Sequence, residues 1–226
     1  MNRVIRRKQR GFTLIELMLS MSFLSMLLIV IMLTIMQITR IYDKGVSMRE
    51  VNQVGRSVAA DLTRTIGSAS PFDLASTASF RQTTGSGGQP NSGRLCTGQS
   101  SYVWNIGDAT VNGSDVRFVK VHDPTGEYCA SGANVSANPN KVDLLEGGER
   151  DLVMHNFTIS QLGGASVSGQ ALYSVRFIIG VKDTTLLESN NAACKPPAES
   201  QGGSDFCAVN RFDLVIRAGN KELLSE

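Results

Sequence analysis

The stretch GFTLIELMLSMSFLSMLLIVIMLTIM, residues 11–36, dominates the organisation of this 226-residue chain. From residue 12 to residue 36 it is almost wholly apolar, and Glu16 is its single charged residue. A helix rises about 1.5 Å per residue, so this run is long enough to cross a hydrocarbon core of about 30 Å. The core helix of a soluble protein would carry a polar stripe, whereas this run has only scattered Ser and Thr. We therefore expect residues 12–36 to span a membrane.

The preceding segment, MNRVIRRKQRG (residues 1–11), carries five basic residues and no acidic residue. Basic segments beside a membrane span stay in the cytoplasm, so we expect the N-terminus inside and everything after about residue 40 outside. A secretory signal peptide is the alternative interpretation. Its apolar region is typically about 7–15 residues long and ends at a small-residue cleavage site, and no such site follows this longer run.

Glu16 is costly in an apolar run, because an unpaired carboxylate loses its hydration there. One interpretation is that it reaches back to the lipid headgroups. A second follows if the chain is cut after Gly11, because Phe12 would then carry a new α-amine. Glu16 lies four residues from Phe12, one helical turn, so the carboxylate and the amine could pair within one chain or between neighbours.

The basic leader, the motif Gly11-Phe12-Thr13-Leu14-Ile15-Glu16-Leu17 and the apolar run together resemble the class III signal of type IV prepilins and pseudopilins. The resemblance is strong over residues 1–40 only. It implies that a prepilin peptidase cuts between Gly11 and Phe12 and methylates the Phe12 amine. It also implies that Glu16 neutralises that amine on an adjacent subunit and sets the filament register. Many major pilins carry Pro where this chain has Leu33, so local melting at that point is not expected here.

Residues 37–66 continue as an amphipathic helix. Their apolar residues fall on one helical face, with Gly67 and Pro71 marking the end: Ile41, Met48, Val51, Val58, Leu62 and Ile66. One continuous helix from Phe12 to Ile66 is expected. Residues 52–66, NQVGRSVAADLTRTI, are similar to PilW-like larger minor pilins, where a Gln-x-x-Gly-Arg motif precedes the end of the long helix. An amphipathic helix in which Gly55 and Arg56 are incidental is the alternative.

Residues 67–226 read as a β-rich extracytoplasmic head with 12 basic and 16 acidic residues. Alternating apolar and polar residues predict half-buried antiparallel strands, at 114–123, 151–162, 171–182 and 209–217. Loops are expected at 68–100, 131–150 and 189–208. A turn at Asp123-Pro124-Thr125-Gly126 is expected to lead to a short strand near Tyr128. The order of one long helix followed by strands predicts an α+β, pilin-like fold, with the helix packed on an antiparallel sheet.

All four cysteines lie in the part predicted to be outside, which is typical of disulfides in an oxidising compartment. We favour the pairs Cys96–Cys129 and Cys194–Cys207, because neighbours in sequence close shorter loops. A zinc site is the alternative, but the chain has no C-x-x-C, and His122 and His155 are far apart.

No catalytic or nucleotide-binding fingerprint is present, so an enzyme is not expected, and both histidines are interpreted as structural. The acidic residues Asp143, Glu146, Glu149 and Asp151 surround Gly147-Gly148. A solvated acidic loop is favoured over a Ca²⁺ site, since the spacing is not that of an EF-hand. No cofactor is expected, and the acidic head disfavours nucleic acid as a partner.

The sequence thus predicts a structural subunit of a type IV pilus-like filament. Its expected partners are other pilin subunits, the prepilin peptidase, the pilus assembly platform and, before assembly, the inner membrane. Its expected location is a single-pass inner-membrane protein, then a periplasmic or surface filament. The size and long loops favour a minor pilin. The alternatives are a pseudopilin of a type II secretion system, a DNA-uptake pilus subunit and a tip adhesin.

Overall fold

A computed structural model describes residues 12–85, 88–107, 109–111, 113–146, 150–163, 169–189, 191–196, 199 and 206–219. The chain divides into two compact units, Met1–Asp43 and Lys44–Glu226. Helix α1 (Leu14–Ser68) contributes residues to both units. The first unit consists of the apolar part of this helix, and the second contains a mixed helix and sheet core.

Helix α1 begins and ends close to the predicted limits of 12 and 66. It begins at Leu14, because Thr13 caps its first turn. At the other end it passes through Gly67 to Ser68, and the amide of Ala69 still donates to the carbonyl of Ile66 at 3.1 Å. The prediction that Gly67 terminates the helix was therefore wrong by about one residue, and the predicted continuity is confirmed.

In the second unit, α1 buries one stripe of side chains. Its members recur at helical spacing: Ser47, Val51, Val54, Gly55, Val58, Leu62 and Ile66. The prediction named four of these correctly. It was wrong for Met48, which is 38% exposed, because Ser47 occupies the buried angle one residue earlier. Ile41, the other member of the predicted face, belongs to the first unit and is exposed.

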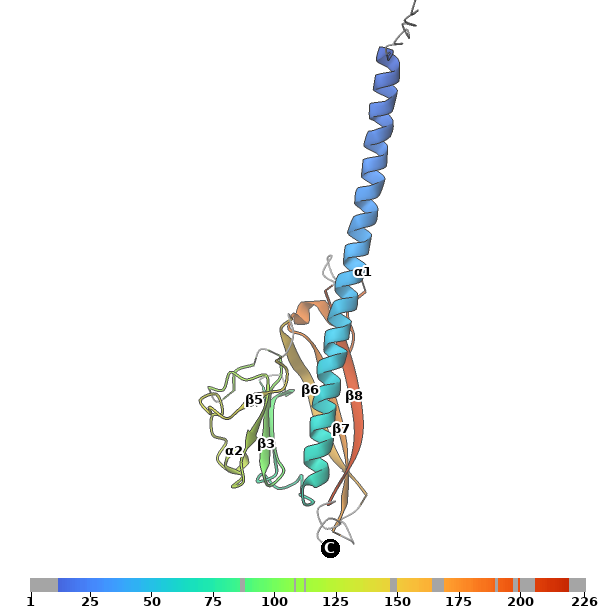
Figure 1. Cartoon of the computed structure of the whole chain (residues 1–226). Coiled ribbons are helices and arrows are strands. Elements are labelled where there is room, and N and C mark those ends of the chain that lie inside the picture. Colours follow the sequence, from blue (N-terminus) through green and yellow to red (C-terminus); the bar gives the residue numbers. More distant parts are fainter. Residues whose placement is uncertain are drawn as a thin grey trace, which may run out of the picture. The chain divides into compact units, whose positions relative to one another are not determined.

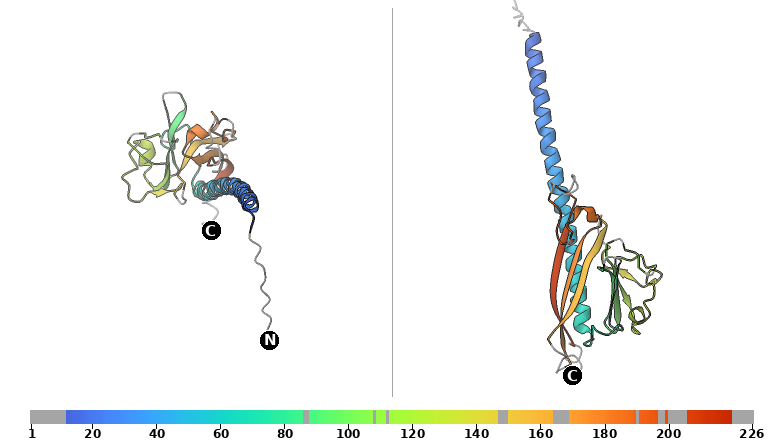
Figure 2. Two further views of the ribbon diagram at one scale, coloured as in Figure 1. Left: turned by 90° about the horizontal axis from the view of Figure 1, so that it is seen from above. Right: turned by 180° about the vertical axis from the view of Figure 1, so that it is seen from behind.

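Three long antiparallel strands form the sheet that lies along the second-unit part of α1 (Figure 1). They are β6 (Leu152–Leu162), β7 (Ala171–Val181) and β8 (Val209–Ala218), in that spatial order. The predicted alternation is confirmed along β7, whose Tyr173, Val175, Phe177 and Ile179 are all buried. Figure 2 shows the same layer from behind, with the second sheet beside it.

The second sheet has five antiparallel strands in chain order: β1 (Phe80–Thr84), β2 (Pro90–Cys96), β3 (Ser100–Asn105), β4 (Phe118–His122) and β5 (Val142–Asp143). The predicted loops 68–100 and 131–150 were therefore wrong in part, because they contain β1, β2 and β5. Polar composition concealed these strands. Gly93 in β2 lies opposite Trp104 in β3 and is covered by its indole ring, so a residue that reads as a turn former occupies a strand.

The segment after β4 also differs from its prediction. The turn at 123–126 forms, with the Gly126 amide donating to the Asp123 carbonyl at 3.3 Å. It leads into a short helix, α2 (Glu127–Ala130), where a strand was expected. The physical reason is Asp123, whose carboxylate accepts hydrogen bonds from the amides of Glu127 at 3.0 Å and Tyr128 at 3.1 Å. That capping favours a helical turn.

A polar cluster attaches α1 to the five-stranded sheet. The Asp61 carboxylate accepts hydrogen bonds from the Tyr102 hydroxyl at 2.8 Å and from Lys120 Nζ at 2.9 Å. Lys120 also donates to Thr65 Oγ1 at 2.7 Å. Burial alone would raise the pKa of Asp61, but the hydrogen bonds from Lys120 and Tyr102 outweigh it and lower that pKa below its ordinary value.

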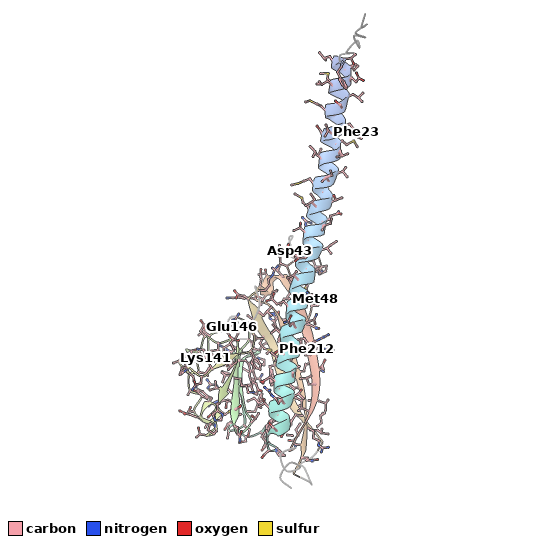
Figure 3. All side chains as sticks on the ribbon, viewed as in Figure 1. Phe23, Asp43, Met48, Lys141, Glu146 and Phe212 are labelled. Carbon is pink, nitrogen blue, oxygen red and sulfur yellow. A yellow bond between two sulfur atoms is a disulfide. The ribbon has the colours of Figure 1, made fainter. Side chains whose placement is uncertain are left out.

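At Gly55 the backbone of α1 lies directly against the three-stranded sheet. A Cβ placed there would lie 2.1 Å from the ring of Phe212, which lies against α1 (Figure 3). Phe212 in turn stacks on Phe177 at 5.1 Å between ring centroids. Gly55 is therefore required by packing, whereas the resemblance of the Gly-Arg pair to the larger minor pilins stays untested.

We predict that Gly55→Ala lowers the free energy of unfolding by about 1–3 kcal/mol, because the added methyl displaces the half-buried ring of Phe212, which packs against the core. The matched control is Gly45→Ala, since a Cβ at Gly45 meets no atom within 4 Å. That control should raise the stability by up to about 1 kcal/mol through helix propensity. Urea unfolding followed by Trp104 fluorescence measures both. Equal effects of the two substitutions would contradict the close approach.

Candidate functional site

The N-terminal end of α1 forms a capping box from Thr13 and Glu16. The amide of Glu16 donates to Thr13 Oγ1 at 3.4 Å, and Glu16 Oε2 accepts from the Thr13 amide at 3.4 Å and the Thr13 hydroxyl at 3.3 Å. Reciprocal bonds of this kind satisfy two of the amides that a helix leaves unpaired at its start. The carboxylate also lies at the positive end of the helix dipole. Glu16 therefore has a structural partner before any other chain is present.

The pattern Thr-x-x-Glu ahead of an apolar run is the sequence signal of a capping box, and the sequence analysis missed it. The sequence-based prediction assigned a role to Glu16 and none to Thr13. Phe12 lies directly before the cap and its side chain is 81% exposed. Gly11, the other predicted processing residue, lies outside the described residues.

No other described part of the chain covers the apolar side chains of the first unit. Among the described residues, α1 is the one helix long and apolar enough to cross a membrane, and none of its most apolar stretch is buried. A core helix of a soluble protein would be mostly buried. The hydroxyls of this stretch bond to their own helix, as Ser20 Oγ does to the Leu17 carbonyl at 2.9 Å and Thr34 Oγ1 to the Ile31 carbonyl at 2.7 Å. They therefore present no unsatisfied polar group to lipid.

Both cysteine bridges in the structure join the pairs that the sequence favours. Cys96–Cys129 ties the end of β2 to α2, with 6.2 Å between the Cα atoms. Cys194–Cys207 closes the segment before β8, with 6.0 Å between the Cα atoms.

Two of the four acidic residues considered as calcium ligands, Asp143 and Asp151, lie beside a cation of the protein. Arg117 lies 3.6 Å from Asp143 and 3.6 Å from Asp151, so one guanidinium joins two of the four candidate calcium ligands. Burial raises the pKa of Asp143, which weakens it as a calcium ligand. Glu146 is exposed, and Glu149 lies outside the described residues. Within the described residues, no three His, Cys, Asp or Glu side chains gather into a metal-binding group. The predicted solvated acidic loop, with Ca²⁺ binding as its disfavoured alternative, stays untested.

The two histidines occupy unlike surroundings. His122 is exposed at the end of β4, whereas His155 is 4% exposed and sits at an irregularity of β6. His155 Nε2 lies 3.0 Å from the Val181 carbonyl, so this nitrogen carries the proton, and Nδ1 has no partner among the described residues. Burial lowers the pKa of His155, so the buried ring is kept neutral.

One of three comparisons with known proteins returned a match, and that match lies within the first unit. A family model described as the prokaryotic N-terminal methylation motif matches residues 6–36. The match includes Gly11, Phe12 and Glu16 and supports a pilin-like, structural protein. A comparison with curated proteins and one with solved structures each returned no match.

We predict that the stability of the head falls as the pH drops below about 6.5, where unfolded histidine takes up a proton. The pKa of His155 is lower in the folded state, so the unfolded state binds more protons. The free energy of unfolding therefore falls with pH until the pH reaches that lower pKa. His155→Leu should flatten this part of the profile. Thermal unfolding from pH 7.5 to 5 measures the difference. An unchanged slope in His155→Leu would show that another group is responsible, and His122→Leu is the exposed control.

Proposed function

We propose that this chain is a structural subunit, of the minor-pilin kind, of a type IV pilus-like filament. In this proposal a prepilin peptidase removes residues 1–11 and methylates the Phe12 amine, and the subunit then enters the filament through α1. The observation that carries the proposal is the conjunction of the methylation-motif match with the capped N-terminal part of α1, whose apolar residues up to Met36 are all exposed.

The physical basis of assembly is an exchange of surroundings. In the inner membrane, the apolar side chains of residues 12–36 contact lipid. In a filament they contact the same segment of neighbouring subunits, which also excludes water. The burial of apolar area therefore contributes little to the free energy difference between the two states. A charge pair can then decide which neighbouring subunit is accepted.

Glu16 is the group that we assign to this choice. After cleavage, the Phe12 amine is a buried positive charge that needs a carboxylate, and Glu16 of an adjacent subunit supplies it. The bonds to Thr13 engage Oε2 alone and are long, at 3.3–3.4 Å, so the carboxylate can still pair with an ammonium group in an apolar core.

The pseudopilin of a secretion system, the DNA-uptake pilus subunit and the tip adhesin share this helix chemistry. N-terminal mass spectrometry on two fractions, sheared filaments and washed membranes, separates the main cases. N-methylated Phe12 in sheared filaments supports a surface pilin. N-methylated Phe12 confined to membranes supports a pseudopilin. An intact Met1, or a cut elsewhere, contradicts the proposed processing.

Processing gives the next prediction. Gly11→Val should block cleavage, because the larger side chain occupies the position that the peptidase reads, and the chain should keep the mass of its leader. Leu33→Val, in the same apolar helix but far from the cut, is the matched control and should be processed normally. Mature-sized Gly11→Val protein on an immunoblot would refute the assigned cleavage point.

Assembly gives a separate prediction. Glu16→Ala should leave cleavage intact and reduce incorporation into sheared filaments by at least about tenfold, since an unpaired buried charge costs about 3–5 kcal/mol. Ser20→Ala is the control one turn further on, because its hydroxyl is already bonded within the helix. Quantitative blotting of sheared and membrane fractions measures the ratio. Normal incorporation of Glu16→Ala would remove the proposed role of Glu16 in subunit choice.

A further inference from the structure

A cleft of about 710 Å³ lies in the second unit, where α1 ends. Its walls come from the last turns of α1, the segment that follows α1, the residues before β1, the turn between β2 and β3 and the turn after β4. The volume falls within the range of about 300–1,000 Å³ that small-molecule sites occupy. All the lining residues are described, and the processing and assembly residues lie elsewhere in the chain.

The lining is unusually rich in hydroxyl groups. Seven Ser and Thr residues and Gln99 contribute to it, and it contains no carboxylate. The side chains of Ser70, Ser79, Ser100 and Gln99 make no hydrogen bond within the part of the chain that the structure describes. Most small-molecule sites are largely apolar with few polar groups. Free hydroxyl and amide groups in this proportion favour a ligand that itself carries many hydroxyls.

The charge of the cleft comes from Arg64 and Lys120. The ammonium group of Lys120 already bonds to Asp61 and Thr65, so we do not assign it a ligand. Arg64 has one bond, from a terminal nitrogen to Asp61 at 3.1 Å, and its side chain is 80% exposed. Its remaining N–H groups are available to a carboxylate. The cleft therefore offers one exposed cation with unused N–H donors, beside residues 67–226, which carry four more acidic than basic residues.

The walls of the cleft are held in place before any ligand arrives. The Tyr173 hydroxyl accepts from the Phe72 amide at 2.8 Å and donates to the Phe72 carbonyl at 2.5 Å, and the two rings stack at 4.4 Å. On the opposite wall, Cys96 is bonded to Cys129. A rigid site loses less conformational freedom on binding, so weak polar contacts are sufficient.

We propose that this cleft binds an acidic saccharide, with the sugar hydroxyls on the Ser and Gln side chains and the sugar carboxylate on Arg64. The inference does not depend on the proposed function, because none of its residues belongs to the anchoring helix segment. It places a recognition site on the head of the protein, separate from the elements that would attach it to other subunits.

The test uses the full chain in detergent, with glucuronic acid and glucose as probes, because these sugars differ by a carboxylate in place of a hydroxymethyl group. Ligand-detected NMR and calorimetry measure binding. Glucuronic acid should bind the wild type more tightly than glucose. Arg64→Gln should weaken glucuronic acid by about tenfold and leave glucose unchanged, as expected for one charge-assisted contact.

Two further variants control the test. Arg56→Gln removes the same charge from an exposed position of α1 outside the cleft and should bind as the wild type does. Ser70→Trp should fill the cleft and abolish binding of both sugars. An unchanged thermal unfolding temperature in each variant shows that the fold is retained.

Three outcomes would overturn the proposal. The first is no binding of either sugar to the wild type. The second is equal loss in Arg64→Gln and Arg56→Gln, which would indicate a general charge effect. The third is binding of inorganic phosphate with the same dependence on Arg64 and no binding of glucose, which would identify an anion site without saccharide recognition.

Discussion

Helix α1 must satisfy two environments, and the rest of the structure depends on that constraint. Up to Met36 its side chains are almost all apolar and all exposed, so this segment needs lipid or other helices around it. From Ser47 onward it buries a single stripe in the head core. A helix with one uniform pattern could not serve both purposes. The change in pattern therefore separates the segment available to other molecules from the segment that specifies the fold of the head.

The head core is joined to α1 by unlike contacts on two sides. Phe212 fits against the bare backbone at Gly55, which is an apolar contact that depends on shape. The contact with the five-stranded sheet is polar: the Asp61 carboxylate bonds to Tyr102 and Lys120. The stability of this contact depends on charge. Because the pKa of Asp61 is lowered in the folded state, this stabilisation is present above the ordinary carboxylate pKa. It is lost as the pH falls through the folded value.

The sequence was sufficient for the long elements and insufficient for the short ones. The continuous helix and strands β6, β7 and β8 follow from apolar periodicity sustained over ten residues or more. Strands β1, β2 and β5 could not be predicted, because most of their residues are polar and their cover comes from other strands, as the Trp104 ring of β3 covers Gly93. The turn of helix at α2 depends on a buried Asp123 carboxylate, which no local pattern reveals. At the candidate site, Glu16 was evident from its charge, whereas Thr13 required recognition of the reciprocal cap.

The bridge between Cys194 and Cys207 has a consequence for the covalent integrity of the head. A protease that cleaves any peptide bond between these two cysteines leaves both fragments attached through sulfur. The strand that follows, β8, carries Phe212 and so stays tethered to the chain that it packs against. A nicked molecule would migrate as one species without reducing agent and as two with it. The head can therefore tolerate damage in this segment that would otherwise release its last strand.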